Sequence, residues 1–116
     1  MNRTALVIVS SDPRTSPRPA EAVRIAAGVG AWKKVRVTLA LWGPAVLALS
    51  EFPDDLVDDD NFSRYLPIIG ELEQPVYVEA GAPLLGELGE APVKFEAIDP
   101  ARLARLAAEN DCVLRF

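Results

Sequence analysis

The chain has 116 residues and half of them are hydrophobic, so we expect one domain over 1–116 with enough apolar side chains for a buried core. Lys and Arg number 12 against 17 Asp and Glu, and this net charge of −5 argues against nucleic acid or a membrane as partner, because both attract basic surfaces. The sequence contains no histidine, which excludes a histidine base, a histidine metal ligand and a Ser-His-Asp relay.

The first part of the chain alternates strand and helix patterns. Residues 4–10 form a continuous apolar, β-branched run, which is typical of a strand buried on both faces. Residues 20–32 place their apolar side chains on one side of a helix, and we expect Gly28 and Gly30 to end it. Residues 34–41 alternate and then become fully apolar, which predicts the second strand.

The middle of the chain reads as helical. Pro44 suits the first turn of a short helix over 44–52. The run Asp58–Asp60 can cap a further helix that buries apolar side chains between 62 and 69. Because Pro67 lies inside that pattern, we expect a break or a kink there.

The last part returns to alternation. It predicts a third strand over 75–79, a short helix over 82–89 and a half-buried strand over 93–98. A helix follows over 99–110, with an Asp N-cap and Pro at its first position. Residues 112–116 form a closing strand.

This order predicts an α/β fold, a three-layer α/β/α arrangement with a mainly parallel five-stranded sheet. In such folds ligands bind at the carboxyl ends of the strands. The predicted ligand-binding residues at these ends are Ser10, Ser11, Asp12, Trp42, Gly43, Glu79 and Gly81.

Three stretches are similar to the DsrE/DsrF-like family, small α/β proteins of sulfur relay. They are the first strand with its SDP loop and alanine-rich helix, the second strand ending in ALWGPAVLAL, and VYVEAGAPLLGEL; together they lie within 4–50 and 74–90. The resemblance implies a DsrE/DsrF-like fold and trimeric or hexameric rings. In active members it implies persulfide transfer on a cysteine at the end of the third strand. That position falls on Glu79 or within one residue of it, where there is no cysteine, so the resemblance implies a member without the catalytic cysteine.

Glu79 is the first catalytic candidate. A carboxylate is neither a soft nucleophile nor a persulfide carrier, so it cannot replace a thiolate. In a semi-apolar pocket it could serve as a general base with a raised pKa. We favour a solvated glutamate or a partner for Arg14 or Arg18, because the sequence shows no second catalytic group.

Cys112 is the second catalytic candidate. It begins the last strand, and the beginning of a parallel strand lies on the rim of the sheet opposite the predicted site. Cysteine is also among the most buried residue types, so we expect inert packing and poor reactivity. An antiparallel last strand, or contacts with another copy, would instead bring Cys112 near a site.

Three other segments have a structural and a functional interpretation. The loop SSDPRTS could hold an anion before the first helix, but it lacks P-loop spacing, so we favour turns and capping by Asp12 and Ser16. The run DDLVDDDN lacks the spacing of an EF-hand, which favours a charged first turn of a helix. The apolar stretches 65–69 and 83–88 could form a subunit interface or part of the core.

The leading hypothesis is a non-catalytic DsrE/DsrF-like subunit that acts in assembly or in binding a small ligand or partner, linked to intracellular sulfur relay beside cysteine-bearing paralogues. One alternative is a sulfur carrier or sulfurtransferase that works through Cys112. Another is an independent small-molecule-binding domain, with Trp42 as an apolar wall. We expect a homo-oligomer, a trimer or a hexamer, with no cofactor and no metal. The lone cysteine and the short N-terminal apolar run, without a signal-peptide pattern, favour a cytoplasmic location.

Overall fold

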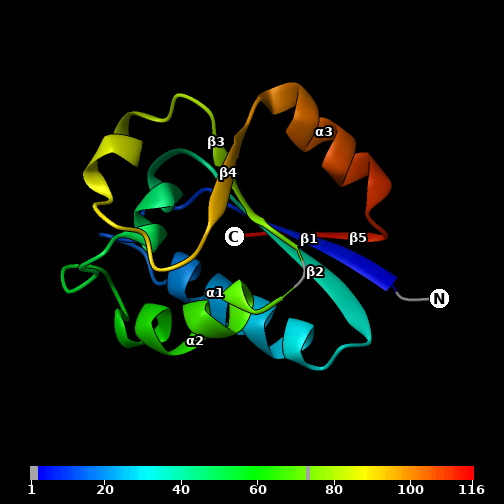
Figure 1. The fold of residues 1–116 in the computed structure, drawn as a ribbon, viewed down its shortest axis with the longest axis horizontal. Helices are drawn as coiled ribbons and strands as arrows, with labels where there is room; N and C mark the ends of the chain where they lie inside the picture. The colour runs from blue at the N-terminus through cyan, green and yellow to red at the C-terminus, as the bar shows by residue number, and fades with distance from the viewer. Residues whose placement is uncertain (1–2, 73) are drawn as a thin grey trace.

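The computed structural model describes residues 3–72 and 74–116, and strands alternate with helices along the chain (Figure 1). The strands are β1 (Arg3–Val9), β2 (Val35–Leu41), β3 (Val76–Glu79), β4 (Phe95–Ile98) and β5 (Cys112–Arg115). The α-helices are α1 (Arg18–Ala31), α2 (Asp60–Gly70) and α3 (Pro100–Glu109). The predicted short helices are the 3₁₀ helices η1 (Gly43–Leu49) and η2 (Pro83–Glu87).

The five strands form one sheet in the order β4-β3-β2-β1-β5, and every neighbouring pair is parallel. β1 pairs with β2 along its whole length, from Arg3 opposite Val35 to Val9 opposite Leu41. Residues 5–9 and 37–41 are buried, as expected for central strands covered on both faces. The predicted α/β class with a mainly parallel five-stranded sheet is confirmed.

The two faces of the sheet are covered unequally. Figure 1 shows α1 and α2 together on one side of the sheet and α3 on the other. The main core lies under α1, α2 and η1, and its largest fully buried side chains include Phe62, Leu41 and Leu49. The opposite core is smaller: Leu6, Ile8, Ala40, Tyr77 and Ile98 lie under the half-buried side chains of α3. The α3 side is therefore the thinner layer of the molecule.

The glycines of α1 do not end the helix. Gly28 and Gly30 both lie inside α1, which continues to Ala31. A Cβ placed on Gly30 would come within 2.6 Å of Cδ1 of Leu72, whereas a Cβ on Gly28 would meet nothing within 4 Å. Gly30 thus allows the chain after α2 to approach α1 closely. This contact between distant segments cannot be recognised from the local sequence, in which a glycine near the end of a helical pattern predicts the helix end.

Three further local expectations need correction. α2 runs through Pro67 without a break; Pro67 lies near the helix end with its ring exposed, so few backbone hydrogen bonds are affected. Asp59 is the N-cap of α2, but its side chain caps no backbone N–H. The strand predicted over 93–98 is shorter, and only Ile98 of β4 is buried, because β4 lies at the edge of the sheet. Among the described residues, no helix is both long and apolar enough to cross a membrane.

Candidate functional site

The structure brings the predicted site residues together at one edge of the sheet. Because all strands are parallel, Val9, Leu41, Glu79 and Ile98 end on the same rim. Backbone hydrogen bonds join the segments that follow them: Trp42 N–H donates to Val9 C=O at 2.8 Å, and Ala80 N–H donates to Ile98 C=O at 2.9 Å. The segments that follow the strands are therefore joined to one another by backbone hydrogen bonds along the carboxyl rim of the sheet.

Glu79 links β3 to the segment after β2. Its Oε1 accepts a hydrogen bond from Gly43 N–H at 3.0 Å in a partly buried position. Gly43 has φ +57°, a left-handed conformation suited to glycine, and it begins η1. The carboxylate thus holds the turn into η1 against the end of β3.

The expected partners of Glu79 are therefore wrong. Arg14 instead pairs with Asp12, its Nη2 lying 2.9 Å from Oδ2, and Arg18 Nη2 donates to Arg115 C=O at 3.4 Å. A backbone N–H satisfies Glu79 where the sequence suggested a guanidinium. The other interpretation of Glu79 was a general base. The hydrogen bond from Gly43 N–H already gives this carboxylate a structural role.

The loop after β1 is organised by its own side chains. Asp12 Oδ1 accepts from Arg14 N–H at 2.9 Å, and Ser16 Oγ accepts from Arg18 N–H at 3.2 Å. The hydrogen bond from the Arg14 guanidinium holds the pKa of the Asp12 carboxyl below its usual value. These contacts agree with the turn-and-capping interpretation of this loop.

The remaining predicted residues lie around the same rim. Ser10 is exposed and Ser11 half-buried, and Ser10 N–H donates to Phe116 C=O at 3.0 Å. Trp42 packs partly buried against the smaller core. Gly81 has φ +81° and lies in the exposed turn after β3. The rim thus offers hydroxyls, an indole and a carboxylate, but its described residues include no thiol.

Cys112 lies at the other end of the sheet. It begins β5, which runs parallel to β1 and pairs Cys112 with Ala5. The expected place on the opposite rim is correct, but Cys112 is exposed, so the expectation of a packed cysteine is wrong. Sequence could not show this, because the exposure follows from β5 being an edge strand.

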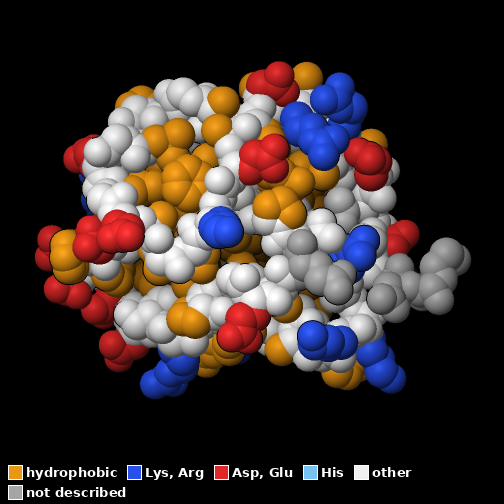
Figure 2. Space-filling view, in the orientation of Figure 1, with side chains coloured by type: hydrophobic (Ala, Val, Ile, Leu, Met, Phe, Trp, Pro, Cys, Tyr) orange, Lys and Arg blue, Asp and Glu red, His pale blue; other side chains and the backbone are white. Residues whose placement is uncertain are grey.

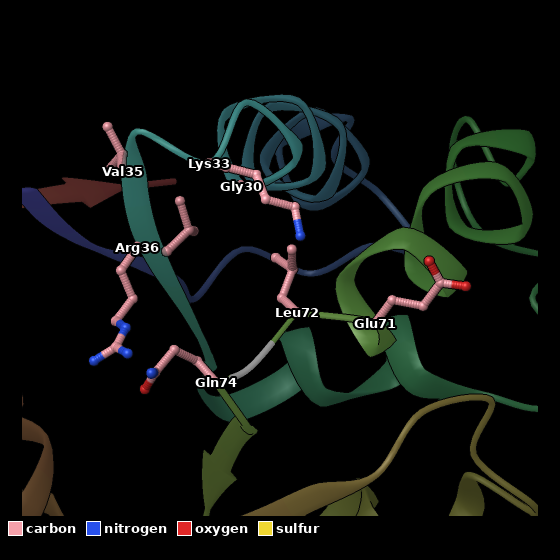
Figure 3. Close-up of a pocket in the computed structure, with 8 residues that line it drawn as sticks. Gly30, Lys33, Val35, Arg36, Glu71, Leu72 and Gln74 are labelled. Carbon is pink, nitrogen blue, oxygen red and sulfur yellow. The ribbon is translucent and has the colours of Figure 1, made fainter. Parts of the chain in front are cut away.

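A small hollow that the sequence did not suggest lies near the amino ends of β2 and β3. Its volume is about 150 Å³, and Lys33, Glu71 and Gln74 are among its lining residues. In Figure 3 the ammonium of Lys33 points toward Leu72, while the Glu71 carboxylate points away. Its side chains do not converge on one point. Among residues 3–72 and 74–116, no group of three or more carboxylates or cysteines could hold a metal ion.

The sheet order, the parallel strands and the helical layers define a three-layer α/β/α fold with an all-parallel sheet. One solved structure with this fold is the ychN protein from E. coli. It matches over 100% of both chains with a TM-score of 0.77, at 20% sequence identity. The fold that the resemblance implied is thereby confirmed. No protein-family model matches the sequence, and no curated protein matches it significantly.

Proposed function

We propose that the protein is a non-catalytic subunit of DsrE/DsrF-like fold, which assembles with copies of itself and binds a partner or small ligand at the carboxyl rim of its sheet. The observation that carries this proposal is the state of Glu79. It ends β3, where the family resemblance locates the sulfur-carrying cysteine, and its carboxylate holds Gly43 N–H. A residue with a structural hydrogen bond has replaced the thiol that sulfur transfer needs.

The link to intracellular sulfur relay is part of this proposal. A rim without the thiol can still bind a partner protein or a small ligand, since recognition depends on the rim and not only on the nucleophile. A cysteine-bearing paralogue is the natural partner for such a subunit.

The test restores a thiol at the rim. Glu79→Cys and Glu109→Cys are each made in a Cys112→Ser background, the second as a control at an exposed position on α3. Both variants receive a low-molecular-weight persulfide, and intact-mass spectrometry follows the gain of one sulfur atom. We expect faster uptake at position 79, because the rim is the relay position. Equal rates at the two positions, in folded variants, would show that the rim has no such role.

One observation favours the alternative of a sulfur carrier: Cys112 is exposed and therefore accessible to a donor. It lies at the amino end of β5, away from the rim that carries Glu79. A carrier through Cys112 would thus need a second site, formed at the opposite rim.

A further inference from the structure

The strand β4 leaves an open edge on the sheet. Among the described residues it pairs only with β3, and its first three residues are exposed, Phe95 at 40%. Ile98 C=O accepts from Ala80 N–H, so the backbone of Ile98 faces β3. Successive residues of a strand turn their N–H and C=O groups to alternate sides, and therefore Glu96 also faces β3 while Phe95 and Ala97 face outward.

The other edge of the sheet is partly blocked. Phe116 N–H donates to Ile8 C=O and Phe116 C=O accepts from Ser10 N–H, so the backbone of Arg115 faces away from β1. The outward C=O of Arg115 accepts from Arg18 Nη2 at 3.4 Å. β5 thus has a guanidinium across its edge, and β4 is the edge more open to another strand.

The side chains of β4 divide between its two faces. Phe95 lies opposite Val76 of the main core, and Ala97 lies opposite buried Val78 on the same face. Glu96 lies opposite Tyr77 on the α3 face, and Lys94, two residues earlier, takes the same face if the strand is continued. One face of the edge is therefore apolar, and the other carries one charge of each sign.

We propose that two copies of this chain pair through β4, antiparallel about a twofold axis, with Phe95 opposite the partner's Phe95. Both residues then exchange N–H···O=C hydrogen bonds through their outward backbone groups. On the other face Lys94 lies opposite the partner's Glu96, and Glu96 opposite the partner's Lys94. The two sheets become one continuous sheet. The contact rests on the proposed assembly role, and because it is twofold it fits the expected hexamer, in which it joins the copies of two trimers, and not a lone trimer.

Charge selects this register. A shift of one strand by two residues keeps the outward groups paired, but it sets Glu96 against the partner's Glu96 or Lys94 against the partner's Lys94. Like charges directly opposite each other destabilise a strand pair, whereas opposite charges stabilise it. The pairing centred on Phe95 is the one that places both lysines against glutamates.

Apolar surface next to β4 extends the contact. A groove of about 640 Å³ is lined by residues that include Pro67, Pro75 and Pro92, and a second hollow of about 500 Å³ is lined by residues 91–95. Figure 2, which views the molecule in the orientation of Figure 1, shows hydrophobic side chains gathered on this face with charges of both signs between them. Each copy's Phe95 ring would lie beside such a surface of the other.

Charge reversal tests the contact by sedimentation velocity. Lys94→Glu and Glu96→Lys each place like charges on both cross-strand pairs, and we expect each to halve the particle mass of the wild type. The double variant exchanges the two charges, keeps the net charge and should restore the wild-type mass. Glu109→Lys, an exposed reversal on α3, should leave the mass unchanged.

Cross-linking tests the register directly. In a Cys112→Ser background, Phe95→Cys should form a covalent dimer under mild oxidation, because residues paired in this way have Cα atoms about 5.5 Å apart, within disulfide range. Ala97→Cys is the matched control, since its counterpart lies four residues along the strand, about 13 Å away.

The outcomes separate the contact from the assembly role. If the wild type is a monomer at all concentrations, the assembly role itself is wrong. If the wild type assembles but neither single reversal lowers its mass, or if Ala97→Cys cross-links in place of Phe95→Cys, the β4 contact is wrong and another surface joins the copies.

Discussion

The hydrogen bond between Glu79 and Gly43 N–H is open to a stability measurement. Glu79→Ala removes the acceptor and leaves the N–H of a turn glycine without it. Hydrogen bonds to charged groups contribute about 1.5–3 kcal/mol, and solvent at the half-exposed Glu79 places the effect at or somewhat below the lower end of this range. We therefore expect the free energy of unfolding to fall by about 1–1.5 kcal/mol, or Tm to fall by about 3–6 °C.

Urea unfolding followed by circular dichroism measures this loss. Glu79→Gln keeps an oxygen acceptor but removes its charge, so its loss should be about 0.5 kcal/mol. Glu109→Ala controls for the removal of an exposed glutamate and should lie within about 0.5 kcal/mol of the wild type. If Glu79→Ala is as stable as this control, the carboxylate does not hold the turn, and the structural account of Glu79 fails.

Four other substitutions test the packing and one helix cap, each by urea unfolding. Gly28→Ala should stabilise the protein by up to about 1 kcal/mol, because the new Cβ has no atom of the described residues within 4 Å. Gly30→Ala should stabilise it less or destabilise it, because the new Cβ would clash with Leu72. Equal effects of the two substitutions would contradict the close approach at Gly30. Phe62→Ala should cost about 3–5 kcal/mol, because Phe62 is 1% exposed in the main core, and a loss below about 1 kcal/mol would contradict its burial. Asp99→Ala should cost about 1 kcal/mol, because the side chain accepts from Arg102 N–H at 2.8 Å, and no loss would show that the cap is unimportant.

The sheet could be predicted because its signals are local and agree with one another. The runs at β1 and β2 are apolar throughout, which only strands covered on both faces require, and helical spacing separates them. Alternation of strand and helix then leaves a parallel sheet as the consistent topology. The Asp99 cap of α3 was also predictable, because its hydrogen bond connects residues three apart.

The features that sequence missed depend on contacts between distant segments. Gly30 lies inside α1 where a Cβ would meet Leu72, and no local pattern reports a neighbour 42 residues away. The exposure of Cys112 follows from the strand order, which places β5 at an edge. The residue type and a last strand taken to be buried suggested a packed thiol, but β5 is an edge strand and Cys112 is exposed.

The candidate site was predictable as a place but not as a set of contacts. Parallel topology by itself puts Trp42, Glu79 and Ser10 on one rim, because each residue ends or follows a strand of the same direction. The acceptor role of Glu79 was not predictable, since its donor is a backbone N–H and leaves no mark in the side-chain sequence. The stretches 65–69 and 83–88, considered as an interface, supply Leu66, Ile69 and Leu88 to the main core.

We propose that the protein is not a sulfur carrier. The most direct test of this proposal follows persulfide formation on Cys112 of the wild type. A persulfide donor is added to the folded protein and to the same protein unfolded in urea, and mass spectrometry follows the gain of one sulfur atom on each. An exposed thiol without a site should react no faster folded than unfolded, and this is the result we predict. Faster uptake by the folded protein would show that the fold activates Cys112, and the protein would then be a sulfur carrier.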